Sequence, residues 1–253
     1  MVEYRQEGRV AVLTINRPEA RNAVNGDVAR SMEEGLDRLE EDEGTWIGII
    51  AGEGPVFSAG ADLKAIAAGQ AADLQTKRGG FGGITARERT KPLIAAVDGP
   101  ALAGGCEIVL SCDLVVASTN ARFGIPEVKR SLVAAAGGLF RLPRALPRNL
   151  AMELALTGDP IDAERAHHFG LVNELVEPGT ALEGALALAE RINANAPVAV
   201  RQSRRVVVEG MLADDDAAWK VTVDAMAKAM ATEDFAEGPL AFIEKRAPQW
   251  KGR

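Results

Sequence analysis

Short apolar runs and longer amphipathic stretches alternate along the first hundred residues. Residues Arg9 to Ile15 are rich in β-branched side chains and too few for a typical helix, so they predict a strand that ends at Asn16-Arg17-Pro18. Apolar runs at Trp46 to Ala51 and Leu93 to Val97 predict two more strands. Strands that are apolar along their whole length favour a mostly parallel sheet covered on both faces.

Helical spacing lies between these strands. One helix is predicted with Asn25 as its N-cap and with an apolar stripe at intervals of four, four and three residues, made of Val28, Met32, Leu36 and Leu39. A further helix is predicted to begin near Asp62. The pattern indicates an α/β core, although no sequence repeat is detectable.

After about Leu146 the pattern predicts a series of consecutive helices, with one strand-like run at Leu171 to Val176. Asp214 to Arg246 also has helical spacing. We therefore expect an α/β core over residues 1–195 and an α-helical C-terminal region over 196–253. Gly69 to Thr90 has little periodicity and contains GGFGG with several cations, so a mobile surface segment is predicted there.

Composition and net charge exclude several classes of protein. The 253 residues are 47% hydrophobic and 26% charged, enough to bury a sizeable core. A net charge of −7 is the wrong sign for an electrostatically driven nucleic-acid or anionic-membrane binder. A polar N-terminus and two cysteines, Cys106 and Cys112, without zinc-ligand spacing predict a cytoplasmic protein without structural metal.

Several catalytic signatures are missing. The chain has neither the Gly-x-Ser-x-Gly turn of serine hydrolases nor a phosphate-binding loop of the Gly-x-x-x-x-Gly-Lys-Ser/Thr type. Its two histidines, His167 and His168, fall at the end of a predicted helix, where they complement the helix dipole. The cysteines have apolar neighbours and are interpreted as core residues.

Two glycine-containing turns, Ser58 to Asp62 and Ala103 to Glu107, each follow an apolar run and precede a predicted helix. Such turns expose backbone N–H groups that can hold a developing anion. Each glycine can also be explained by a tight turn alone.

Two glutamates interrupt apolar sequence. Glu107 lies in Cys-Glu-Ile-Val-Leu and Glu127 in Gly-Ile-Pro-Glu-Val. A buried carboxyl has a raised pKa and can act as a general acid or base near neutral pH. Equally, Glu107 can favour the first turn of its helix electrostatically, and Glu127 can be a solvated loop residue.

Taken together, the motifs resemble the crotonase superfamily, the enoyl-CoA hydratase/isomerase family. The resemblance covers nearly the whole chain and is carried by PVFSAGADLK (55–64), KPLIAAVDGPALAGGCEIVLSCDLVVA (91–117), FGIPEVKRSL (123–132), LTGDPIDAERAHHFGLVNELV (156–176) and GPLAFIEKRAPQW (238–250). It implies a spiral core of repeated strand–helix units.

The resemblance also implies a chemistry. In this family two backbone N–H groups, here those of Ala61 and Gly104, hold the thioester oxygen. Glu107 and Glu127 correspond to two catalytic glutamates of the hydratases, with Glu107 favoured for activating water and Glu127 for protonating carbon. No cofactor is implied, because coenzyme A is part of the substrate.

Substrate contacts and assembly follow from the same resemblance. Coenzyme A contacts are expected in and after the first turn and near the C-terminus, at Ala59, Ala61, Asp62, Leu63, Lys64 and Lys245. The implied assembly is a homotrimer or homohexamer, with contacts made by an apolar stripe of Trp219, Val223, Met226 and Met230. Such a stripe can instead cover the protein's own core.

Some motifs depart from those of common hydratases. Leu-Ala-Gly-Gly (102–105) stands where many have three glycines, and Ala135 stands where glycine is common. These departures leave open the acyl group and three alternatives: an enoyl-CoA isomerase, a carnitinyl-CoA-like dehydratase, and a noncatalytic acyl-CoA-binding relative.

Overall fold

The core of the protein is a six-stranded sheet, seen in a computed structural model that describes residues 1–253. The strands lie in the order β1-β2-β3-β6-β8-β11, and all neighbours are parallel except the β1–β2 hairpin. Their bounds are β1 Val2–Glu7, β2 Val10–Ile15, β3 Ile47–Gly52, β6 Leu93–Val97, β8 Leu114–Ser118 and β11 Glu174–Val176. The predicted, mostly parallel sheet is confirmed.

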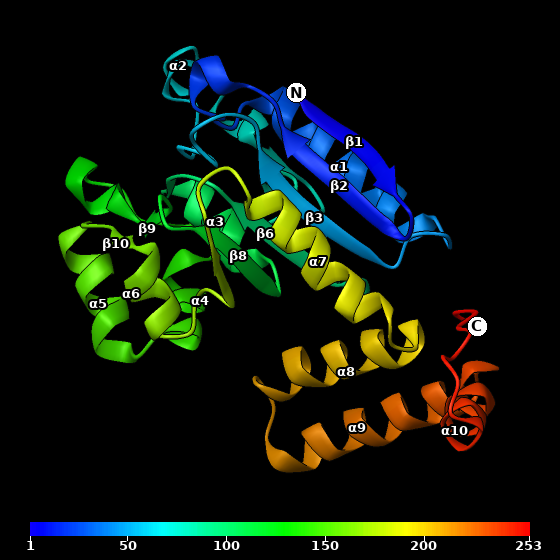
Figure 1. The fold of residues 1–253 in the computed structure, drawn as a ribbon. Coiled ribbons are helices and arrows are strands. Elements are labelled where there is room, and N and C mark those ends of the chain that lie inside the picture. Colours follow the sequence, from blue (N-terminus) through cyan, green and yellow to red (C-terminus); the bar gives the residue numbers. More distant parts are fainter.

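Chain order is preserved across this sheet, so each strand–helix unit advances the chain by one strand and the core winds as a spiral (Figure 1). A small second sheet has the order β10-β9-β7, and β4 pairs with β5 in a hairpin. These short strands are β4 Gln75–Thr76, β5 Gly80–Phe81, β7 Ala101–Leu102, β9 Arg122–Gly124 and β10 Ile161–Asp162. The α/β fold expected from the sequence is confirmed.

The helices surround the sheet and then continue beyond it. They are α1 Gly26–Glu41, α2 Leu63–Ala67, α3 Gly104–Ser111, α4 Gly138–Ala145, α5 Arg148–Thr157, α6 Ala163–His168, α7 Ala181–Asn193, α8 Pro197–Gly210, α9 Asp215–Met230 and α10 Asp234–Glu244, with 3-10 helices at η1 Pro18–Ala20, η2 Ala71–Leu74 and η3 Pro126–Arg130. None of the helices combines the length and apolar character needed to cross a membrane.

Alternation along the strands divides the core between the two faces of the sheet. On one face, Leu13 and Ile15 pack with the buried stripe of α1; on the other, Val10 and Val12 pack with buried alanines of α7. The Asn25 side chain accepts a hydrogen bond from Val28 N at 3.0 Å, which confirms the predicted N-cap of α1. A cap of this kind stabilises a helix by about 1 kcal/mol.

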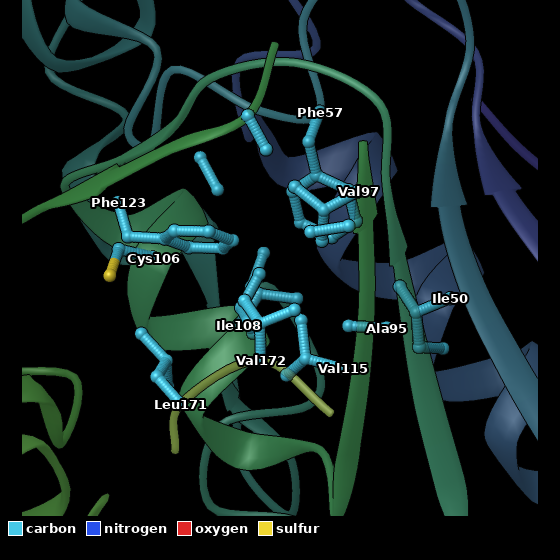
Figure 2. Close-up of a cluster of buried hydrophobic side chains, with 14 of the residues drawn as sticks. Ile50, Phe57, Ala95, Val97, Cys106, Ile108, Val115, Phe123, Leu171 and Val172 are labelled. Atoms are coloured by element: carbon cyan, nitrogen blue, oxygen red, sulfur yellow. The ribbon is translucent and has the colours of Figure 1, made fainter. Parts of the chain in front are cut away.

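Helix α3 packs on the first of these faces and carries the second glycine turn. Figure 2 shows Ile108 of α3 in the same cluster as Val115 of the sheet and Val172, with Phe57 and Phe123 packed around them. Because Phe57 directly precedes the first turn, this cluster holds both turns against one core.

The N-terminal strand β1 is absent from the prediction. Its residues alternate, with Val2 and Tyr4 half-buried and packed against the core while their neighbours are exposed. A strand at the edge of a sheet buries only one side, so its sequence is mostly polar and resembles a free terminus.

The prediction of a surface segment over Gly69 to Thr90 is wrong for residues 79–85. Ile84 and Thr85 are buried, although most of residues 69–78 are exposed. Arg78 and Arg87 both pair with Asp37 of α1, and of the two only Arg87 is largely withdrawn from solvent, with 11% of its side chain exposed against 58% for Arg78. These ion pairs attach both ends of the glycine-rich stretch to α1.

The last three helices lie beside the core in Figure 1. Helix α8 packs along α9 and is joined to the core by Arg204, whose Nε donates to Asp113 at 3.0 Å. Asp113 also pairs with the buried Arg89. The expected boundary at residue 195 falls in the connection between α7 and α8.

Candidate active site

The two glycine turns meet in the folded chain. Leu102 N donates to Ser58 O at 3.0 Å, and Ser58 N donates to Pro100 O at 3.3 Å, so the two segments run side by side. A Cβ on Gly60 would lie only 2.7 Å from the amide nitrogen of Gly104. Gly60 has a φ of +86°, and glycine is therefore required there for both space and conformation.

The amide of Ala61 is left without an acceptor inside the protein. Val24 N donates to Gly60 O at 2.8 Å, and Asp62 N donates to Val24 O at 2.9 Å. Ala61 lies between these two bonds, and successive amides of an extended segment point to opposite sides. Its N–H group therefore points away from Val24.

The amide of Gly104 is also free, because this residue begins α3 and the first N–H groups of a helix have no partner within it. Ala103, which precedes it, has φ 52° and ψ −129°, a conformation unfavourable for a residue with a Cβ. Bonds on both sides hold it there: its N–H donates to Gly124 O and its carbonyl accepts from Glu107 N.

Glu107 lies on the first turn of α3 with only 3% of its surface exposed. Its Oε1 accepts a hydrogen bond from Gly138 N at 2.9 Å. Burial, reinforced by the nearby carboxylate of Glu127 and opposed by that hydrogen bond, raises the pKa of Glu107 to about 7. Its carboxyl can therefore take or give a proton near neutral pH.

Glu127 lies in η3, directly after Pro126. Its side chain is half-buried, and its Oε2 is buried without a hydrogen-bond partner. Burial raises the pKa of this carboxyl as well. Its charge also contributes to the raised pKa of Glu107, so the two carboxyls lie close enough to interact.

The residues around the first turn differ in what they offer a ligand. The Asp62 carboxylate caps α2 through Lys64 N at 3.0 Å and pairs with Arg17 at 3.1 Å, so it is already occupied. Ala59 N donates to Arg21 O. Leu63 and Lys64 are exposed and face solvent.

Lys245 does not join this group within one chain. It is the C-cap of α10, with a φ of +55°, and α10 and α2 lie at opposite ends of the molecule in Figure 1. The other cation expected near coenzyme A, Lys64, lies two residues after the end of the first turn.

The site contains two further residues that the sequence did not predict. The Phe81 ring lies against Gly104, so that a Cβ at Gly104 would collide with it. Arg141 binds the backbone near Glu107 through Ala136 O and Thr85 O. The available signals were an aromatic residue inside a glycine cluster and a cation within the apolar run Gly-Leu-Phe-Arg-Leu.

Other reactive groups lie outside this chemistry. Cys106 is fully buried in the core, and burial raises the pKa of its thiol to about 12. His167 and His168 end α6, as predicted. No group of three or more His, Cys, Asp or Glu side chains is placed to hold a metal ion.

The chain resembles known proteins over its full length. Residues 5–253 match the enoyl-CoA hydratase/isomerase family. The chain is 41% identical to enoyl-CoA hydratase EchA19 of Mycobacterium tuberculosis, covering all of this chain and 96% of that protein. It is 40% identical to the short-chain-enoyl-CoA hydratase of Clostridium acetobutylicum, covering 95% and 94%.

A solved structure agrees with this result. The crystal structure of an enoyl-CoA hydratase from Mycobacterium tuberculosis H37Rv superimposes with a TM-score of 0.96 at 48% identity, covering all of this chain and 99% of the other. Sequence, fold and local geometry thus agree, and the chain belongs to the enoyl-CoA hydratase/isomerase family of the crotonase superfamily.

Proposed function

We propose that this protein is an enoyl-CoA hydratase, a carbon–oxygen lyase of fatty acid metabolism that adds water reversibly to a 2-enoyl-CoA to give a 3-hydroxyacyl-CoA. The observation that carries the proposal is the meeting of two unpaired backbone amides, Ala61 and Gly104, with two glutamates of raised pKa. The similarity to named hydratases over the full chain supports the same activity.

The two amides form the oxyanion hole in this proposal. When water attacks the β-carbon, negative charge moves to the thioester oxygen, where the Ala61 and Gly104 N–H groups donate to it. One well-placed donor of this kind stabilises a transition state by about 3 kcal/mol. Both donors belong to the backbone, so the side chain of Ala61 is unimportant while its N–H group is essential.

The glutamates divide the proton transfers. Glu107 takes a proton from water as the new C–O bond forms at the β-carbon, and Glu127 gives its proton to the α-carbon. The pair keeps the same total number of protons, and exchange afterwards returns each carboxyl to its starting state. A base with a pKa of about 7 is well matched to this step near neutral pH.

The phosphates of coenzyme A are anionic. Because the protein itself carries a net charge of −7, these phosphates need cations placed close to them. Lys64 is exposed beside the oxyanion hole and is the proposed partner within the same chain, together with backbone groups from Ala59 to Leu63. The Asp62 carboxylate then holds α2 rather than contacting the ligand. Lys245 lies too far away in its own chain, so we assign it to the site of a neighbouring copy.

The proposed assembly is a homotrimer or a dimer of trimers through residues 196–253. Trp219 and Val223 are 68% and 65% exposed in the single chain, and the rest of the predicted stripe is exposed as well. The stripe does not cover the protein's own core. A contiguous exposed apolar face of this kind is typical of a protein–protein interface.

The test of the activity is a panel of 2-enoyl-CoA thioesters of increasing chain length. Loss of the absorbance of the conjugated double bond, with a product heavier by one water, is the expected result. Binding of the thioesters without turnover would instead identify a noncatalytic relative. Conversion of 3-enoyl-CoA, with a gain of that absorbance and no added water, would identify an isomerase.

A further inference from the structure

Arg141 links two backbone segments that border the proposed site. It belongs to α4 and is half-buried, and its guanidinium donates from Nη2 to Thr85 O at 2.6 Å and from Nη1 to Ala136 O at 3.3 Å. The forked shape of guanidinium allows both bonds at once, which the single ammonium of lysine does not reproduce.

One of these segments is the bend that holds Glu107. Gly138, two residues after the bonded carbonyl of Ala136, donates its N–H to Glu107 Oε1. Gly137 has a φ of +105°, and a Cβ at this position would collide with the Arg141 guanidinium. The guanidinium therefore fills the inside of the bend, while a backbone amide of the same bend holds the glutamate.

The other segment brings Phe81 to the oxyanion hole. Thr85 N donates to Phe81 O at 3.2 Å, and the Phe81 ring lies against Gly104. A single side chain thus connects the support of the proposed base to the support of a proposed oxyanion donor.

We propose that Arg141 is a positioning residue. It fixes the 136–138 bend so that the Gly138 N–H group holds the Glu107 carboxyl where it can take a proton from the attacking water. This inference rests on the proposed hydratase function. The charged groups around Glu107 are Glu127 of η3 and Arg141 of α4, with the buried Cys106 thiol next to it in α3. Removing Arg141 therefore leaves a second carboxylate as the dominant charge near Glu107.

The test compares Arg141→Gln and Arg141→Lys with the parent, measuring kcat and KM for crotonyl-CoA across pH. Arg141→Gln is expected to lower kcat about 10- to 100-fold with little change in KM, as for a displaced catalytic group. The acidic limb of its kcat profile moves to higher pH, since Glu107 loses a nearby positive charge. Arg141→Lys keeps the charge and is expected to recover part of kcat and most of the pH profile.

The matched control is Arg144→Gln, on the exposed side of the same helix, which removes an equal charge without touching the bend. It is expected to behave like the parent. Equal losses in Arg141→Gln and Arg144→Gln would overturn the inference, as would parental kinetics in Arg141→Gln. If Arg141→Gln folds poorly, Arg141→Lys is compared with the parent instead. A lower kcat with a nearly parental pH profile supports the inference, and a parental kcat contradicts it.

A second measurement separates this inference from the function itself. Titration of ¹³C-labelled glutamate carboxyls by NMR, with Glu107 assigned by the signal lost in Glu107→Gln, needs no substrate. A higher pKa of Glu107 in Arg141→Gln supports the positioning role, and an unchanged pKa contradicts it. A parent protein inactive on crotonyl-CoA and longer enoyl-CoAs would refute the hydratase proposal but leave this titration valid.

Discussion

The carboxyls of Glu107 and Glu127 are the groups on which the proposed hydration depends most directly. We expect Glu107→Gln and Glu127→Gln each to lower kcat by about 10²- to 10⁴-fold, because the amide keeps the shape but cannot exchange the proton. Thioester binding and the fold remain, which steady-state kinetics and calorimetric binding of a 3-hydroxyacyl-CoA can measure.

Glu34→Gln provides the control for this pair, because it makes the same chemical change on the exposed surface of α1. Its kinetics should equal those of the parent. Parental turnover in either active-site variant would remove that glutamate from the mechanism.

The same carboxyl links pH to stability. Burial raises the pKa of Glu107 from 4.5 to about 7, so the folded state binds a proton that the unfolded state releases between these pH values. The stabilisation is complete below pH 4.5 and is lost as pH rises to about 7. At about 1.4 kcal/mol per pKa unit, the loss is about 3 kcal/mol.

Glu107→Gln should abolish this dependence, because glutamine does not titrate. Urea unfolding of parent and variant at pH 5 and pH 8 measures it: the variant gains stability over the parent at pH 8 and gains far less at pH 5. A difference between the two proteins that is the same at both pH values would show that Glu107 ionises normally in the folded state.

At the scale of elements, the oxyanion hole depends on two turns whose donors are backbone amides. Ala61→Pro removes one donor outright, whereas Ala61→Gly keeps it. We expect Ala61→Pro to lower kcat by about 10²- to 10³-fold, the loss typical of one missing donor. Ala61→Gly should stay near the parent rate.

Circular dichroism and thermal unfolding show whether the proline variant folds. A folded Ala61→Pro protein with unimpaired kcat would exclude the Ala61 amide from the site. If the variant does not fold, a twofold or smaller effect of Ala61→Gly still tests the claim that the side chain is dispensable.

At the scale of the whole molecule, α8 to α10 expose apolar residues that the core does not cover. Sedimentation velocity at micromolar concentration should give three or six times the chain mass of 26.7 kDa. Val223→Glu, which places a charge in the exposed stripe, should shift the protein toward the monomer.

Leu156→Glu serves as its control, since Leu156 is 69% exposed on α5, outside the C-terminal helices. It should leave the sedimentation profile unchanged. A stable species of monomer mass for the parent would refute the assembly, and with it the role assigned to Lys245 in a neighbouring site.

Features that depend on neighbouring residues can be predicted from the chain's local pattern. The strand over Leu93–Val97, the N-cap at Asn25 and the start of α2 after Asp62 follow from local periodicity and capping, and the structure confirms them. Strand β1 was not found because an edge strand is polar on one side. The motifs around Glu107 and Glu127 also indicated the family.

How distant segments meet depends on the complete fold. The contact of Gly60 with Gly104, the Phe81 ring on Gly104 and the bonds of Arg141 to Ala136 O and Thr85 O join residues far apart in the chain. The pKa of Glu107 likewise depends on burial by several elements. The periodicity of a helix or strand predicts which of its faces is apolar. What covers that face depends on how all the elements pack together.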